Sequence, residues 1–190
     1  MLVSVGVSTR LLGWCRSESH PARLAGRAGR ATAARPRASI NFRPAQDKDG
    51  ELIRKTIWGL RMNPLGLNLR NFSVAETDSG VVGFAQLKPL TASSVELASL
   101  VILEKHRYCG VGTRLALHVL EQARGRSVYL TTLQRTTPFF KGLNFREIGL
   151  TEGPWPLVLT ALAGTVVARA AAQDRLVVMK RLGKEDSIRS

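Results

Sequence analysis

The stretch that decides the fold is residues 95–113, which read VELASLVILEKHRYCGVGT. Its first nine residues, 95–103, are almost continuously apolar, which predicts a central β-strand that is covered on both faces. The chain then changes sharply to charged residues, and from Gly110 to Ala123 apolar residues recur at helical spacing. The stretch therefore predicts a buried strand, a glycine-containing turn and an amphipathic helix.

The turn between this strand and helix is residues 107–112 (RYCGVG). Glycines in such a turn let backbone N–H groups approach a ligand closely, and the helix N-terminus adds the positive end of a dipole. The spacing does not fit a P-loop, which requires G-x-x-x-x-G-K-[ST], and the first glycine of a dinucleotide-binding fingerprint is missing. The turn therefore suits a pyrophosphate, but its spacing is neither that of a P-loop nor that of a dinucleotide-binding fingerprint.

On these residues the sequence resembles the GCN5-related N-acetyltransferase (GNAT) superfamily, whose signature [Q/R]-x-x-G-x-[G/A] follows the fourth strand. Residues 138–145 (PFFKGLNF) are similar to the superfamily's F-Y-x-x-x-G-F segment. The resemblance covers about residues 40–182. The phrases MNPL, ELASL, HRYCGVGT and TTPFF look most like the plastid acetyltransferases of plants and green algae. This implies an α/β protein, with a mixed, mostly antiparallel central sheet of six to seven strands flanked by helices.

The same resemblance implies acetyl-coenzyme A as co-substrate, with no metal. One strand would hold the pantetheine arm through its backbone, and the glycine turn would hold the pyrophosphate. The residues implied for cofactor binding are Leu100, Val101, Ile102, Arg107, Tyr108, Cys109, Gly110, Val111, Gly112 and Thr113. For Arg107, a role of the side-chain charge and a role of the backbone alone are both open.

Two further positions concern the chemistry. Glu96 stands eleven residues before Arg107, the offset at which histone-modifying members of the superfamily carry a glutamate general base. A carboxylate beside an apolar strand is expected to have the raised pKa that this role needs, and a purely structural role at the strand start is the alternative. Phe140 stands where many members have a Tyr that protonates the leaving thiolate, and Phe has no proton to donate.

The formal net charge of +14 is concentrated in the first quarter of the chain. Residues 1–46 hold eight Arg and one acidic residue, so half of the net charge lies there. A segment rich in Arg, Ala, Ser and Gly and poor in acids is typical of an organelle transit peptide, with a basic nucleic-acid-binding arm as the alternative. We expect residues 1–39 to be a disordered transit peptide and residues 40–190 to be the GNAT domain. Family likeness favours the chloroplast, and the mitochondrion is the alternative.

The remaining elements follow from periodicity and turn residues. We expect strands at residues 40–44, 72–76, 81–87, 127–133, 145–149 and 175–182, and helices at 51–60, 139–143 and about 157–172. Thr136-Thr137-Pro138 predicts a helix start with a hydroxyl cap. The longest apolar stretch, residues 154–168, is too short and interrupted to span a bilayer, which takes about 20 residues.

These observations predict an acetyltransferase that moves the acetyl group of acetyl-CoA to a protein amine, either an N-terminal α-amine or a lysine ε-amine. An α-amine has a pKa of about 7.7 to 8.0 and a free lysine about 10.4, so N-termini are the easier acceptors near neutral pH. The alternatives are a non-catalytic acetyl-CoA-binding regulatory module and an acetyltransferase of a small-molecule amine. No nucleic-acid partner is expected, and the oligomeric state is not predicted.

Overall fold

The computed structural model describes residues 39–60, 62, 66–159, 161 and 174–181. The predicted transit peptide, residues 1–39, lies outside the described residues except for its last position. Most of the helix predicted at about 157–172 also lies outside them, although a helical segment is described at residues 155–159 and 161. The fold below is therefore that of the described part of the predicted domain.

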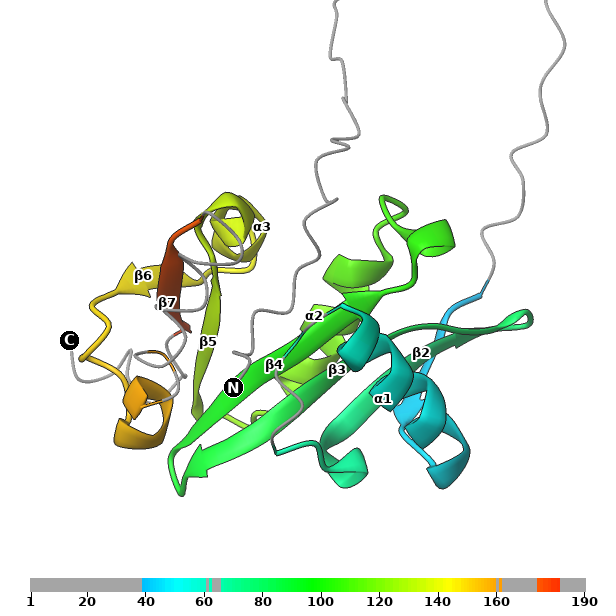
Figure 1. The fold of residues 1–190 in the computed structure, drawn as a ribbon, viewed down its shortest axis with the longest axis horizontal. Helices are drawn as coiled ribbons and strands as arrows, with labels where there is room; N and C mark the ends of the chain where they lie inside the picture. Colours follow the sequence, from blue (N-terminus) through cyan, green and yellow to red (C-terminus); the bar gives the residue numbers. More distant parts are fainter. Residues whose placement is uncertain (1–38, 61, 63–65, 160, 162–173, 182–190) are drawn as a thin grey trace, which may run out of the picture.

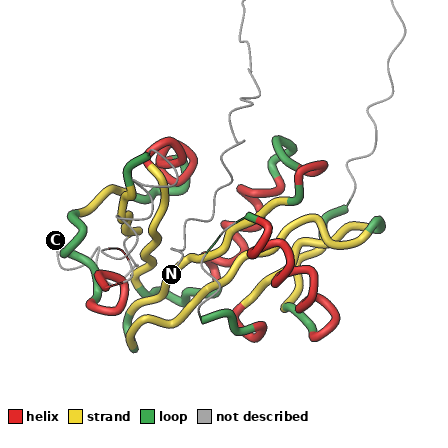
Figure 2. The backbone as a smooth tube through the Cα atoms, viewed as in Figure 1, coloured by secondary structure: helices red, strands yellow, loops and turns green. Residues whose placement is uncertain are grey.

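Strands and helices follow each other along the chain much as predicted (Figures 1 and 2). The strands are β1 (Asn41–Pro44), β2 (Phe72–Thr77), β3 (Gly80–Thr91), β4 (Ser94–Ile102), β5 (Ser127–Leu133), β6 (Arg146–Ile148) and β7 (Leu176–Arg181). The helices are α1 (Gly50–Gly59), α2 (Val111–Glu121) and α3 (Thr137–Lys141), with 3-10 turns η1 (Asp47–Asp49), η2 (Leu69–Asn71), η3 (Glu104–His106) and η4 (Gln134–Thr136). The main difference is that β3 continues to Thr91, four residues beyond its predicted end.

All seven strands form one sheet in the order β1-β2-β3-β4-β5-β7-β6. Every neighbouring pair is antiparallel except β4 and β5, which run parallel. The predicted fold class, a mixed and mostly antiparallel sheet flanked by helices, is confirmed. The predicted central strand is also confirmed, because β4 occupies the middle of this order.

The parallel pair β4–β5 is joined only at its beginning. Ser94, Val95 and Glu96 pair with residues of β5, and the last of these pairs is Glu96 with Tyr129. Beyond that point the strands spread apart, as Figure 1 shows where β5 and β4 diverge toward α3 and α2. Residues 97–102 of β4 therefore present an open backbone edge on the β5 side.

Strand β4 contains a β-bulge in this open half. Phe84 of β3 pairs with Val101 and Gln86 pairs with Ala98, so Ser99 and Leu100 together oppose the single residue Ala85. Ser99 has a φ of 51°, in the left-handed region. Such a bulge bends the strand and shifts the alternation of its side chains.

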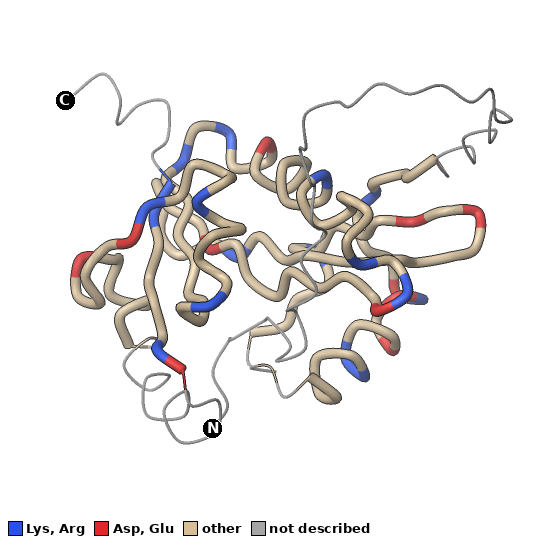
Figure 3. The backbone as a smooth tube through the Cα atoms, turned by 90° about the horizontal axis from the view of Figure 1, so that it is seen from above, with Lys and Arg blue, Asp and Glu red and all other residues tan. Residues whose placement is uncertain are grey.

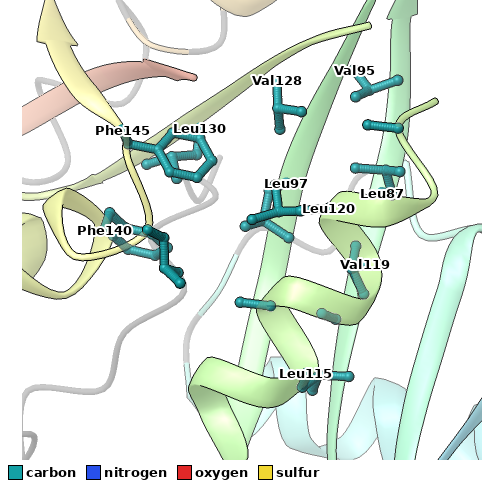
Figure 4. Close-up of a cluster of buried hydrophobic side chains, with 14 of the residues drawn as sticks. Leu87, Val95, Leu97, Leu115, Val119, Leu120, Val128, Leu130, Phe140 and Phe145 are labelled. Carbon is teal, nitrogen blue, oxygen red and sulfur yellow. The ribbon is translucent and has the colours of Figure 1, made fainter. Parts of the chain in front are cut away.

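Helices cover both faces of the sheet. Helix α2 covers one face, and Figure 4 shows its leucine and valine side chains against β3 and β4, with Phe140 and Phe145 beside Leu130 on the β5 side. Helix α1 covers the opposite face over β2 to β4. The apolar cluster between α1 and this face of the sheet consists of Ile53, Ile57, Met62, Phe72, Val74, Phe84 and Val101. On the same face as α1, the segment around Leu157 forms a separate apolar cluster over β5 and β7.

An ion network fixes the edge of the sheet to the start of α1. Arg43 of β1 hydrogen-bonds Asp49 through two nitrogens, at 2.7 and 3.0 Å, and its Nε donates to Glu76 of β2 at 2.7 Å. Asp49 also accepts the backbone N–H of Gln46 at 2.8 Å. These hydrogen bonds hold the pKa of the Asp49 carboxyl below its usual range, against the opposing effect of burial.

The predicted hydroxyl cap of α3 is wrong, although Pro138 does lie in the first turn of the helix. The Thr136 hydroxyl donates instead to the carbonyl oxygen of Leu133 at 2.7 Å and lies 2.6 Å from the Thr132 hydroxyl. The Thr137 hydroxyl donates to the Gln134 carbonyl. The two hydroxyls are used by the turn η4 that precedes the helix, which leaves them turned away from the N–H groups of α3.

Candidate active site

The glycine turn places the start of α2 beside the end of β4. Tyr108 has a φ of 63° and Gly110, the N-cap of α2, has a φ of 76°. Among the described residues no side chain caps this helix end. The first N–H groups of an α-helix have no partner inside the helix, so those of Val111, Gly112 and Thr113 are available to an anion at the positive end of the dipole.

Arg107 connects this turn to β4 through its side chain. Its Nε donates to the carbonyl oxygen of Ile102 at 2.9 Å. Leu103 donates its N–H to the Val82 carbonyl on β3, so the backbone groups of the preceding residue, Ile102, point to the opposite side. Arg107 therefore occupies one backbone acceptor at the open edge and fixes the geometry of the turn.

The three β4 residues implied for pantetheine binding are not equivalent. Val101 is paired with Phe84 of β3, and its side chain is buried in the α1 cluster. Leu100 and Ile102 are partly buried and pack toward the α2 face. Because of the bulge, the backbone of Ile102 lies on the open edge nearest the glycine turn, whereas Val101 lies in the ladder with β3.

Phe139 of α3 borders the end of β4 and the start of α2 from the β5 side, where β4 and β5 have separated. A Cβ atom added to Gly112 would lie 3.4 Å from Cγ1 of Ile102 and 3.9 Å from Cζ of Phe139. The end of β4, the first turn of α2 and the ring of Phe139 therefore meet at Gly112. Sequence reasoning missed Phe139, because the resemblance drew attention to the neighbouring Phe140.

Phe140 is a core residue. It is 5% exposed and packs edge-on against Phe145 with a centroid distance of 6.0 Å, whereas Phe139 is 38% exposed. The two adjacent rings thus point to different surroundings of α3. Phe140 therefore supplies apolar packing at the position where the resemblance would place a proton-donating Tyr.

Glu96 lies at the vertex where β4 and β5 separate, because its pair with Tyr129 is the last between these strands. The residue is 4% exposed. Burial raises the pKa of the Glu96 carboxyl, and the ammonium of Lys88 opposes this rise from 3.8 Å. The structure therefore places a buried carboxylate with a raised pKa at the vertex, which is the property that a general base for an amine requires.

A polar strip surrounds Glu96 on the face that α1 covers. Lys88 is opposite Glu96 and Gln86 is opposite Ala98, so residues two apart in each strand point to this one face. Gln86 Nε2 donates to the carbonyl oxygen of Gly66 at 2.9 Å, which holds the segment before β2 against β3. Thr131, two residues after Tyr129, has a buried hydroxyl with no hydrogen-bond partner in the described part of the chain.

This strip lies between the apolar cluster under α1 and the cluster around Leu157. Sequence reasoning identified Glu96 in it and missed Gln86, Lys88 and Thr131. The strand pattern alone would have placed Lys88 on the same face as Gln86, but its position opposite Glu96 depends on the register of the β3–β4 pair.

The remaining candidate groups are the cysteine of the turn and possible metal ligands. Cys109 is an exposed free cysteine in the turn. No group of three His, Cys, Asp or Glu that could hold a metal ion occurs among the residues that the structure describes.

Two further properties of the described chain concern membranes and charge. Within the same described ranges, no helix is both long and apolar enough to cross a membrane. Figure 3 shows Lys and Arg interspersed with Asp and Glu along the described chain.

Comparisons with known proteins agree with this arrangement. Residues 68–147 match the family model of the acetyltransferase (GNAT) domain. The chain resembles N-acetylglutamate synthase from Neisseria gonorrhoeae, solved with coenzyme A and N-acetyl-glutamate, at 21% identity and a TM-score of 0.59 over 75% of this chain. It spans only 35% of the length of that synthase chain. No curated protein sequence matches the chain.

Two shorter proteins are similar over nearly their whole length. Rv2747 from Mycobacterium tuberculosis, solved with CoA and NLQ, has 20% identity and a TM-score of 0.59, covering 75% of this chain and 98% of that one. Arabidopsis thaliana Naa50, solved with the bisubstrate analogue CoA-Ac-MVNAL, has 17% identity and a TM-score of 0.52, again covering 75% and 98%. At these identities the structural likenesses show the fold, and the match of residues 68–147 to an acetyltransferase domain model supports the acyltransferase class.

Proposed function

We propose that this GNAT acetyltransferase domain transfers the acetyl group of acetyl-CoA to a protein amine, either an N-terminal α-amine or a lysine ε-amine. The observation that carries the proposal is the divergence of β4 and β5, which combines an open backbone edge with a buried carboxylate at its vertex. The glycine turn and the uncapped start of α2 lie at the far end of the same edge. The site thus joins an anion-binding end to a proton-accepting end.

The residues present fit coenzyme A. The free N–H groups of Val111, Gly112 and Thr113 suit its pyrophosphate, and the absence of a side chain at Gly112 leaves room for close approach. We assign pantetheine binding to the open edge around Leu100 and Ile102. Arg107 holds the turn in place through Ile102. When bound, acetyl-CoA supplies the thioester carbon that the amine attacks.

The protein's own contribution to the chemistry is centred on Glu96. An ammonium has no lone pair, so only the neutral amine attacks the thioester, and the nitrogen of the adduct then carries a proton that must be removed. The buried carboxylate of Glu96, with its raised pKa, accepts that proton. Phe140 donates no proton, so the leaving thiolate must be stabilised or protonated without it. An acceptor that is already neutral therefore suits this site best.

Different similar structures support a protein acceptor and a small-molecule acceptor. The similarity to Naa50, solved with a peptide-containing bisubstrate analogue, supports a peptide α-amine. The similarity to N-acetylglutamate synthase supports a free amino acid as the second candidate. The core position of Phe140 motivates a third possibility, a regulatory module that binds acetyl-CoA without turnover.

The experiment is product analysis with the full chain. Binding of acetyl-CoA is first measured by calorimetry. The protein is then incubated with acetyl-CoA and a peptide library, and the products are identified by mass spectrometry, with Glu96→Gln as the control. Acetylated peptides that depend on Glu96 support the proposal. Binding without any product would favour the regulatory module, and product only from free amino acids would favour the small-molecule enzyme.

We further propose that residues 1–39 direct the protein to the chloroplast, with the mitochondrion as the alternative. The Arg-rich, acid-poor composition of this segment supports an organelle presequence. A fusion of these residues to a fluorescent protein, expressed in plant cells, distinguishes the two destinations. Diffuse fluorescence throughout the cytosol would contradict both.

A further inference from the structure

The ammonium of Lys88 lies beside the carboxylate that the mechanism uses. Lys88 Nζ is 3.8 Å from Glu96 Oε2, and the two side chains are 32% and 5% exposed. A Cβ atom added to Gly66 would lie 3.4 Å from the same Nζ. The ammonium is therefore located between Glu96 and the segment that Gln86 fastens to β3.

This position lies where an acceptor amine must come. Glu96 is almost fully buried, so an amine that transfers a proton to it has to approach from the polar strip, in which the partly exposed Lys88 lies 3.8 Å from the carboxylate. On the β5 side, Glu96 is next to Tyr129, whose ring carries the ammonium of Lys180 at 5.5 Å from its centroid. The charged groups facing the site from β3 and β7 are thus both cationic.

We propose that Lys88 makes the site selective for α-amines over lysine ε-amines, by offsetting the negative charge that would otherwise draw a protonated amine to Glu96. This inference rests on the proposed function and names its substrate class. A carboxylate alone would attract an ammonium and let it lose its proton inside the site. With Lys88 beside it, the acceptor enters as the neutral amine.

The neutral fraction then decides which acceptors react. At pH 8 roughly half of the α-amines are neutral, but only a few in a thousand lysine side chains are, given pKa values of about 7.7 to 8.0 and about 10.4. Removal of the Lys88 charge should relieve the restriction on lysines more than on α-amines. We expect the ratio of kcat/KM for α-amines to that for ε-amines to fall about tenfold, the effect of one unit in an acceptor pKa.

The test uses the full chain and two matched peptides, one with a free N-terminus and no lysine, the other with a blocked N-terminus and one lysine. The variants are Lys88→Met, the charge-retaining Lys88→Arg, and Lys55→Met, which removes an exposed lysine of α1. Lys88→Met should lower the selectivity ratio, Lys88→Arg should restore it, and Lys55→Met should leave it unchanged. Lys88→Gln replaces the Met variant if that protein does not fold.

A second readout separates this effect from a merely structural one. Lys88 lowers the pKa of Glu96, so its removal should move the acidic limb of the pH–rate profile to higher pH. An unchanged selectivity ratio in a folded Lys88→Met protein would overturn the inference. So would a loss confined to free amino acids, because Lys88 would then bind an acceptor carboxylate. If the wild-type protein acetylates neither peptide, the proposed function itself fails.

Discussion

The Nε atom of Arg107 donates a hydrogen bond of 2.9 Å to the carbonyl oxygen of Ile102, and this bond joins the glycine turn to the end of β4. The two residues belong to the two parts of the proposed coenzyme A site. Their contact holds the turn against the open edge of β4. The side chain of Arg107 therefore acts on the protein's own backbone, which refines the choice between a charge role and a backbone role.

Arg107→Ala should weaken acetyl-CoA binding about tenfold and lower the free energy of unfolding by about 1 to 2 kcal/mol, because a charged donor to a backbone carbonyl is lost. Calorimetry and urea unfolding measure the two effects. Arg70→Ala, a change at an exposed position in η2, is the control. Unchanged binding in the Arg107 variant would show that the turn keeps its geometry without this bond.

Glu96→Gln should abolish most activity while making the protein more stable at pH 8. The folded state raises the pKa of Glu96, so the stability associated with its protonated form is complete below the ordinary value of 4.5 and is lost as pH rises through the folded pKa. A neutral amide avoids that loss, and proton-transfer groups typically contribute about 10²- to 10⁴-fold in rate. Thermal unfolding at pH 4 and pH 8 should show the gain only at the higher pH, and a gain that is equal at both would contradict this account.

Replacing the two phenylalanines of α3 should have different effects, mainly on stability for Phe140 and mainly on acetyl-CoA binding for Phe139. Phe140→Ala leaves a cavity in the core and should lower the free energy of unfolding by about 3 to 5 kcal/mol. Phe139→Ala removes a partly exposed ring at Gly112 and should weaken acetyl-CoA binding while costing about 1 kcal/mol of stability. Urea unfolding and calorimetry on both variants provide the comparison, and each variant is the control for the other. Equal stability losses would mean that the rings do not differ in surroundings.

Asp49→Asn should destabilise the protein by about 2 kcal/mol at neutral pH, because Arg43 loses a buried charged partner. The folded state lowers the pKa of Asp49, so its stabilisation is present above the ordinary value of 3.8 and disappears as pH falls through the folded pKa. The difference between wild type and variant should therefore shrink on acidification in urea unfolding. Asp47→Asn, at an exposed neighbouring position, should show no such difference.

Local sequence signals predicted most of the fold, and the reason is visible in particular elements. The β-branched and aromatic run SVYLTTL predicted β5 at Ser127–Leu133, where the structure has it. The apolar positions of 110–123 predicted the buried face of α2, with Leu115 and Val119 in the core. In both cases the side chains themselves create the period that defines the element.

Local sequence signals did not predict how the elements pair and pack against one another. The register of β3 against β4 puts Lys88 opposite Glu96, and it depends on the irregularity between Pro89 and Thr91 near the turn that joins the two strands. The different surroundings of Phe139 and Phe140 depend on how a five-residue helix packs. Only the complete sheet shows that Glu96 is the last residue joined to β5.

The bulge at Ser99 also makes chain length, as distinct from residue identity, a requirement of the site. Removing one residue there would restore a regular ladder with β3, in which Val101 still opposes Phe84, and would remove the bend that the extra residue gives to the open half of β4. Side chains at positions 99 and 100 can vary as long as the number of residues between Glu96 and Arg107 does not. The interval between these two residues is therefore a better criterion than the intervening letters for recognising the same site in other chains.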